Sequence, residues 1–242
     1  MEASILLWYC YTRLTVINID LAKPVSAASR NPSMLEAHNL EITRGDRRLC
    51  SGISLELKPG TLLLVSGSNG SGKTSLLRAL CGLLLPSAGE VLWNGENVRS
   101  LREEYGRHLV YVGHANALKD DLTVAENLDV LCALSGIETN PEQRRQSLIQ
   151  FGLSGREHLP AKSLSQGQRR RTTLARLSVS GALPLWILDE PFAALDSNAI
   201  SHMQSVVGTH LTGGGMVVMT THQEVPIAAP TLRELNLDGF GH

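Results

Sequence analysis

Apolar positions from residue 34 onward divide the chain into strand-like and helix-like segments. Residues 35–42 and 53–57 alternate apolar and polar side chains, which predicts two half-buried antiparallel strands with a turn near Gly45. Unbroken apolar runs are instead typical of strands that are covered on both faces. Three such runs occupy residues 61–66, 185–188 and 216–220.

Helical spacing follows the first of these runs, where leucines recur on one face of a predicted helix and Gly82 can cap its C-terminus. The leucines are Leu76, Leu77 and Leu80. The pattern is helical again between residues 122 and 150, and Asn140-Pro141 predicts a helix start within it. Short strands are expected at residues 90–93 and 109–112. We therefore expect a largely parallel α/β core with antiparallel strands at its front and a helical subdomain at about residues 115–165.

Composition adds limits to this picture. The chain has 242 residues, of which 43% are apolar and 19% charged, enough for one folded domain with a small appendage. Its net charge of −1 gives no basic excess, so we expect no nucleic-acid partner. The four cysteines form no C-x-x-C pair and are interpreted as reduced thiols. No apolar run approaches the roughly 20 residues of a membrane-spanning helix.

The first 33 residues differ from the rest. Residues 22–33 are small and polar with two prolines, and regular patterning begins at Met34. We predict an N-terminal extension over residues 1–33, disordered or not translated in the native protein, and a single domain over residues 34–242.

The strongest motif is GSNGSGKT, which follows a predicted strand and precedes a predicted helix. Its glycines leave room for phosphates beside backbone N–H groups, Lys73 supplies a positive charge, and the Thr74 hydroxyl can ligate Mg²⁺. A structural glycine-rich turn is the weaker alternative. The residues expected to bind the nucleotide here are Gly67, Ser68, Asn69, Gly70, Ser71, Gly72, Lys73, Thr74 and Ser75.

A second element is LWILDE, an apolar strand that ends in two carboxylates. Asp189 is expected to hold Mg²⁺, and Glu190, which faces elsewhere, to act as the general base for the attacking water. Alone, this pair would more often be a solvated strand end. Because the same chain carries the phosphate loop, we instead expect a functional carboxylate pair.

Between these elements lies Leu164-Ser165-Gln166-Gly167-Gln168, which resembles the LSGGQ signature of ABC transporter ATPases. Ala194-Leu195-Asp196 resembles the D-loop of that family, and His222 falls where its switch histidine lies. The resemblance implies a P-loop ATPase domain that works as a homodimer. In such a dimer Ser165, Gly167 and Gln168 of one subunit cover ATP bound to the other, and Lys73, Glu190 and His222 serve hydrolysis.

Two positions depart from the family pattern. His114 stands where the Q-loop glutamine is expected, and Arg44 stands where an aromatic residue usually stacks on adenine. Both are still candidate nucleotide contacts, and His114 adds a titratable group at the relay to the membrane partner. For most of the run Arg169-Arg170-Arg171 we favour a solvated or salt-bridged helix face and assign no catalytic role.

Further stretches, such as LWILDEPF and TTHQ, make the chain similar to the ATP-binding subunits of the cytochrome c maturation system, a family of haem-exporting ATPases. That resemblance implies ATP and Mg²⁺ as cofactors and an integral membrane permease as partner. It also implies a peripheral location on the cytoplasmic face of a bacterial inner membrane. The alternative is the ATPase subunit of another ABC importer or exporter.

Overall fold

A computed structural model describes residues 33–221 and 226–241 of the chain. The prediction of a separate extension over residues 1–33 therefore lies almost wholly outside the described residues. One sheet is antiparallel, with strand order β2-β1-β4-β5, and forms the front that the alternating pattern predicts. Its strands are β1 (Leu35–Arg44), β2 (Arg47–Leu57), β4 (Ala88–Trp93) and β5 (Glu96–Asn97).

The second sheet is parallel, with strand order β6-β7-β8-β3-β9. The three unbroken apolar runs are its central strands, as predicted. The edge strand β9 is new, because its residues are mostly exposed and carry no apolar pattern. The strands are β3 (Thr61–Ser66), β6 (Leu109–Val112), β7 (Leu185–Leu188), β8 (Met216–Thr220) and β9 (Thr231–Asn236).

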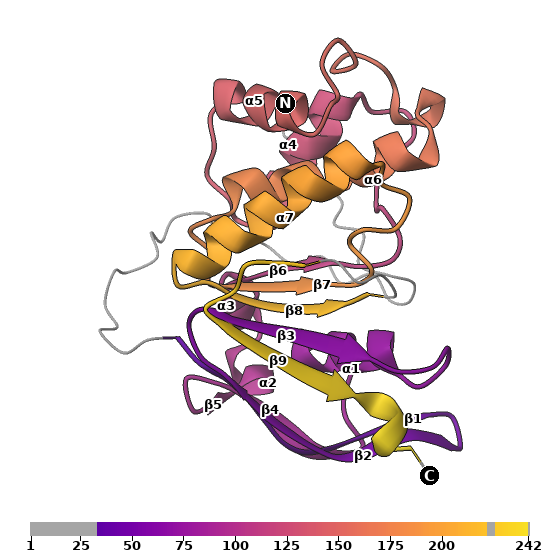
Figure 1. Ribbon diagram of the computed structural model, residues 1–242, viewed down its shortest axis with the longest axis vertical. Coiled ribbons are helices and arrows are strands. Elements are labelled where there is room, and N and C mark those ends of the chain that lie inside the picture. Colours follow the sequence, from indigo (N-terminus) through magenta and orange to yellow (C-terminus); the bar gives the residue numbers. More distant parts are fainter. Residues whose placement is uncertain (1–32, 222–225, 242) are drawn as a thin grey trace, which may run out of the picture. The chain divides into compact units, whose positions relative to one another are not determined.

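Helices connect and cover the sheets, as Figure 1 shows. The α-helices are α1 (Lys73–Leu80), α2 (Val98–Leu101), α3 (Glu103–Gly106), α4 (Val124–Leu134), α5 (Pro141–Gln150), α6 (Gln166–Ala175) and α7 (Ser197–Thr212). Three short 3₁₀ helices are η1 (Ala161–Ser163), η2 (Arg176–Val179) and η3 (Leu237–Gly239).

The core has two parts because the parallel strands are apolar on both faces. On one face, residues such as Leu63 and Ile187 pack with α1 and the antiparallel sheet. On the other, Leu62 and Leu188 pack with α7 and the helical subdomain. The parallel sheet is therefore packed on both faces, and this packing fixes the position of the carboxyl ends of its strands.

The helical subdomain owes its sharp boundaries to capping. Thr123 accepts a hydrogen bond from the Glu126 N–H, and the Glu126 carboxylate accepts one from the Thr123 N–H, at the start of α4. Asn140 and Gln143 form the same reciprocal pair at α5, with Pro141 in its first turn. The predicted helix start at Asn140-Pro141 is confirmed.

A stacked ring pair lies in the second core. The His210 imidazole of α7 stacks on the Trp186 indole of β7, with ring centroids 3.7 Å apart and planes 3° from parallel. His210 is 7% exposed, and burial lowers its pKa to about 4. A methyl group at Gly215 would collide with this ring, so the glycine leaves the space that the imidazole fills.

Three of the four cysteines fall in the described residues. Cys50, Cys81 and Cys132 are buried free thiols, in agreement with the reduced state expected from sequence. Burial raises the pKa of Cys132 to about 11. Within the ranges 33–221 and 226–241, no helix combines the length and apolar character of a membrane span.

Candidate nucleotide site

The phosphate loop joins β3 to α1, and its shape depends on glycine. Gly67, Gly70 and Gly72 have φ angles of 142°, 83° and 104°, a region that side-chain-bearing residues rarely adopt. A Cβ at Gly67 would also lie 2.7 Å from the Ser71 hydroxyl oxygen. The loop therefore turns tightly and leads directly into the first turn of α1.

Lys73 and Ser71 are hydrogen-bond donors at this loop. The Lys73 ammonium donates hydrogen bonds to the carbonyls of Gly67, at 2.7 Å, and Ser68, at 3.0 Å. The Ser71 hydroxyl is buried and has no hydrogen-bond partner among the described residues. Together with the unpaired N–H groups of the first turn of α1, these donors fit the oxygens of a triphosphate.

Asp189 is held at the end of β7 by two hydroxyl groups. Thr74 donates to one of its carboxylate oxygens and Thr220 to the other, each at 2.8 Å, and Asp189 is 2% exposed. Carboxylate and hydroxyl oxygens are the ligands that Mg²⁺ prefers. In the described part of the chain, no group of three or more His, Cys, Asp or Glu side chains is arranged to hold a metal ion. Thr74 and Asp189 thus fit a Mg²⁺ ion that is shared with phosphate oxygens.

Glu190 follows directly with an unusual backbone. Its φ angle is 49°, and its N–H donates to the Thr220 hydroxyl at 2.8 Å. Its side chain is 31% exposed, and its carboxylate lies 3.9 Å from the His114 imidazole nitrogen Nδ1. The two neighbouring carboxylates therefore occupy different environments, one buried and bonded, the other open to water.

The signature helix α6 begins at a third capping box. The Ser165 hydroxyl accepts from the Gln168 N–H at 3.3 Å, while the Gln168 side chain accepts from the Ser165 N–H at 3.0 Å. Gly167 packs against the D-loop, because a Cβ there would lie 2.7 Å from the Ala194 carbonyl oxygen. Gln166, which replaces the usual glycine, is exposed. The substitution at 166 is accommodated, whereas position 167 has no such room.

The D-loop is fixed from both sides. Ala194 has a φ of 61°, and Asp196 caps α7 by accepting from the Ala199 N–H at 2.9 Å. The other Asp196 oxygen lies 3.7 Å from the Arg171 guanidinium on α6. The signature helix and the D-loop therefore form one packed unit.

Arg170 is the exception in an arginine run for which a solvated or salt-bridged helix face was predicted, since Arg169 and Arg171 each pair with an aspartate. Arg170 is 4% exposed, and it donates hydrogen bonds to the carbonyls of Gly113, Asp189 and Glu190, each at 2.8 Å. Its spacing to buried Leu174 on α6 was the available signal, since residues four apart share a helix face.

Asp238, in η3, is a second residue that sequence reasoning missed. Its carboxylate accepts from the Ser68 N–H at 2.9 Å and from the Ser68 hydroxyl at 2.8 Å. These bonds, first among the causes, lower the pKa of Asp238. The contact joins positions 170 residues apart, so no local motif could have indicated it.

Two further predicted contacts, Arg44 and His222, are not among the interactions described above. Arg44 lies exposed at the end of β1, where its role toward adenine stays a prediction. His222 lies outside the described residues, and its role as the switch histidine is likewise untested. Ser165, Gly167 and Gln168 are assigned to a second subunit's nucleotide, which one chain cannot display.

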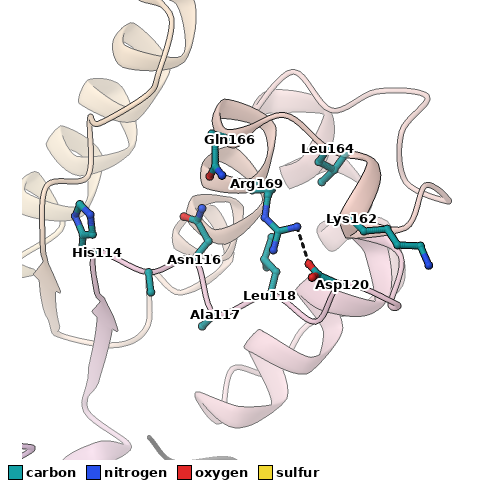
Figure 2. Close-up of a pocket in the computed structure, with 10 residues that line it drawn as sticks. His114, Asn116, Ala117, Leu118, Asp120, Lys162, Leu164, Gln166 and Arg169 are labelled. Atoms are coloured by element: carbon teal, nitrogen blue, oxygen red, sulfur yellow. Dashed lines mark ion pairs between the residues drawn. The ribbon is translucent and has the colours of Figure 1, made fainter.

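An open hollow of about 610 Å³ lies between the His114 segment and the start of α6, as Figure 2 shows. His114 stands at one side, Asn116 and Leu118 follow along the loop, and Gln166 lies on the helix. At the other side the Arg169 guanidinium pairs with Asp120 at 2.7 Å. The floor therefore combines apolar and amide groups with a neutralised charge pair.

Comparisons with known proteins agree with this geometry. Residues 50–193 match the family model described as ABC transporter. A cytochrome c biogenesis ATP-binding export protein CcmA from Nitrosomonas europaea is 52% identical over 84% of this chain and 95% of its own. Proteins of the same name from Dechloromonas aromatica and Salmonella typhi are 51% and 44% identical, over 84% and 86% of this chain and 100% and 98% of their own.

Solved structures share the fold. An ATP-binding subunit of an ABC transporter superposes with a TM-score of 0.71 at 24% identity, covering 78% of this chain and 79% of its own. The dimeric, ADP- and phosphate-bound cassette MJ0796 gives 0.68 at 22% identity, covering 78% and 88%. The chain therefore belongs to the ATP-binding proteins of ABC transporters, and within them to the CcmA family of cytochrome c biogenesis proteins.

Proposed function

We infer that the chain is the ATP-hydrolysing, energy-coupling subunit of an ABC transporter complex that serves c-type cytochrome biogenesis through haem export or haem handling. The observation that carries the ATPase assignment is the joined pair of Thr74 and Asp189 beside the Lys73 loop, with Glu190 next in sequence. The cytochrome assignment rests on relatives with up to 52% identity that bear that name.

ATP hydrolysis at this site follows from the placement of the charges. Lys73 and the N-terminus of α1 stabilise the β- and γ-phosphates. A water oxygen attacks the γ-phosphorus while the Glu190 carboxylate takes its proton, and the bond to the bridging oxygen breaks to leave ADP and phosphate. Mg²⁺, when held by Thr74 and Asp189, supplies further charge neutralisation at the phosphates.

A homodimer completes the site in this proposal. Ser165 begins α6 with an exposed hydroxyl that still has its proton to donate, and the helix dipole adds positive potential there. A γ-phosphate bound to a second subunit would be received by this helix start. Binding of ATP then closes the dimer, hydrolysis reopens it, and an isolated subunit is nearly inactive.

The membrane partner is proposed to be an integral permease that docks at the hollow beside His114. This hollow lies between the segment after β6 and the signature helix, two elements that both lead to the nucleotide site. A helix seated there would sense their relative movement. The location proposed for the subunit is the cytoplasmic face of a bacterial inner membrane.

The decisive experiment compares Glu190→Gln with Glu142→Gln, which makes the same change on the exposed start of α5. Glu190→Gln should abolish steady-state ATP turnover and c-type cytochrome assembly in cells, while Glu142→Gln preserves both. Normal cytochrome assembly in the Glu190→Gln strain would remove the cytochrome assignment. Undiminished ATP turnover would remove the catalytic one.

Membrane subunits that co-purify from detergent extracts separate this function from its alternative. A permease of the cytochrome c maturation system is expected. An importer or exporter permease of another kind would instead assign the chain to that transporter.

A further inference from the structure

Arg170 connects three segments that meet at the catalytic end of the parallel sheet. Its Nη1 donates to the carbonyl of Gly113, which follows β6, and its Nη2 donates to the carbonyls of Asp189 and Glu190, after β7. The residue itself belongs to α6, five positions after Ser165. One guanidinium thus joins the signature helix to the catalytic strand end.

These bonds fix the backbone of Glu190. A φ of 49° is costly for a residue with a side chain, so the surrounding structure must impose it. The Glu190 N–H is held by Thr220 and its carbonyl by Arg170, each at 2.8 Å, and the carbonyl also accepts from the Ala193 N–H at 3.2 Å. Because the direction of a side chain follows from its backbone, these bonds together set the direction of the Glu190 carboxylate, and Arg170 is the one donor among them that comes from the signature helix.

Burying the charged guanidinium of Arg170 costs free energy of desolvation. All three bonds of the Arg170 Nη atoms go to carbonyl oxygens, and its buried Nε has no partner among the described residues. An apolar side chain of similar size would avoid the cost of desolvating a cation. Attraction to the Asp189 and Glu190 carboxylates offsets part of that cost. Arg170 is therefore tied to the catalytic strand end by its charge as well as by its hydrogen bonds.

The helix that carries Arg170 is itself well held. Gly167 presses against the Ala194 carbonyl, and Arg171 pairs with Asp196 of the D-loop. Arg169, by contrast, bonds to Asp120 and to the Ala161 carbonyl, both in the helical subdomain. Among these three neighbours, Arg170 is the one that reaches the backbone of the catalytic carboxylates.

We propose that Arg170 is a positioning residue for hydrolysis, which holds Glu190 in its left-handed conformation and anchors it to the signature helix of the same subunit. The proposal rests on the ATPase function above. The turnover of the unmodified protein tests that function separately from the role of Arg170.

The first test uses R170M and R170K, with R145Q, at an exposed position on α5, as the control. R170M should lower kcat about tenfold or more by misdirecting the base, and R170K should fall between it and wild type. The KM for ATP should stay within about twofold in both, because the phosphate loop contacts other residues. R145Q should keep kcat and KM near those of wild type.

A second readout needs no nucleotide. Hydrogen–deuterium exchange should rise in R170M at peptides covering residues 186–194 and 110–116, the two segments that Arg170 holds. R145Q should leave both unchanged. Unchanged exchange in R170M would overturn the proposal, as would a kcat near that of wild type.

A double-mutant cycle with Glu190→Gln separates positioning from general loss of structure. If Arg170 acts through Glu190, R170M should add little to the single-turnover loss that E190Q already causes. Fully additive losses would overturn the proposal. If R170M melts below the assay temperature, R170K decides: a lowered kcat with unchanged KM supports the role, and a wild-type kcat contradicts it.

Discussion

His210 makes the stability of this domain depend on pH in a way that can be calculated. Burial lowers its pKa from 6.5 to about 4 in the folded protein. The unfolded chain therefore binds the proton more tightly than the folded one. The neutral imidazole contributes stability that is present above pH 6.5 and is lost as the pH falls toward 4.

The magnitude follows from those two values. Complete loss of the contribution corresponds to about 3 kcal/mol, at roughly 1.4 kcal/mol for each pH unit between the two pKa values. At pH 5 roughly 2 kcal/mol of the free energy of unfolding should already be lost relative to pH 7.5. His210→Gln removes the titration while keeping a polar side chain of similar size in contact with Trp186.

Urea unfolding at pH 7.5 and pH 5 measures the effect. Wild type should lose about 2 kcal/mol more than His210→Gln between the two conditions. His158→Gln, at an exposed position, should behave like wild type. Equal losses in wild type and His210→Gln would refute the reasoning, since the imidazole would then not be held neutral by the fold.

Further predictions concern other contacts. Asp238→Asn should raise the KM for ATP about fivefold with kcat preserved, because the charged acceptor of the Ser68 loop is weakened; an unchanged KM in steady-state assays would contradict this. Lys73→Ala should lower kcat/KM for ATP about 100-fold or more, and fluorescent-nucleotide binding should fail with it. Thr123→Ala should cost about 1 kcal/mol in thermal or urea unfolding through loss of the α4 cap, and a stability equal to wild type would deny the cap its role.

Much of the fold could be predicted because its signals are local. The runs that became β3 and β7 have boundaries that match the sequence pattern, since each has an unbroken apolar stretch of four residues that is followed by a polar residue. The edge strand β9 was missed because it pairs with β3 alone and is mostly exposed, so burial leaves no pattern in its sequence. Such an edge strand is held mainly by backbone hydrogen bonds to its neighbour, and these bonds leave no apolar pattern in the sequence.

The candidate site divides in the same way. The Lys73 loop could be predicted because eight successive residues, 67–74, form one phosphate-binding motif. Arg170 could not, because it lies in a run of three arginines that resembles a solvated face. Asp238 reaches Ser68 only through the path of β9 beside β3. Such contacts depend on tertiary structure, so no local sequence pattern predicts them.

The tight approach of Gly167 to the Ala194 carbonyl has a consequence for how this protein can diverge. The two middle positions of the signature look equivalent in a sequence, yet one borders solvent and the other borders another loop's backbone. Substitutions should therefore be tolerated at position 166, where glutamine already stands. At position 167 they should not be tolerated unless the D-loop moves as well. A library randomised at both positions should return diverse residues at the first and glycine at the second.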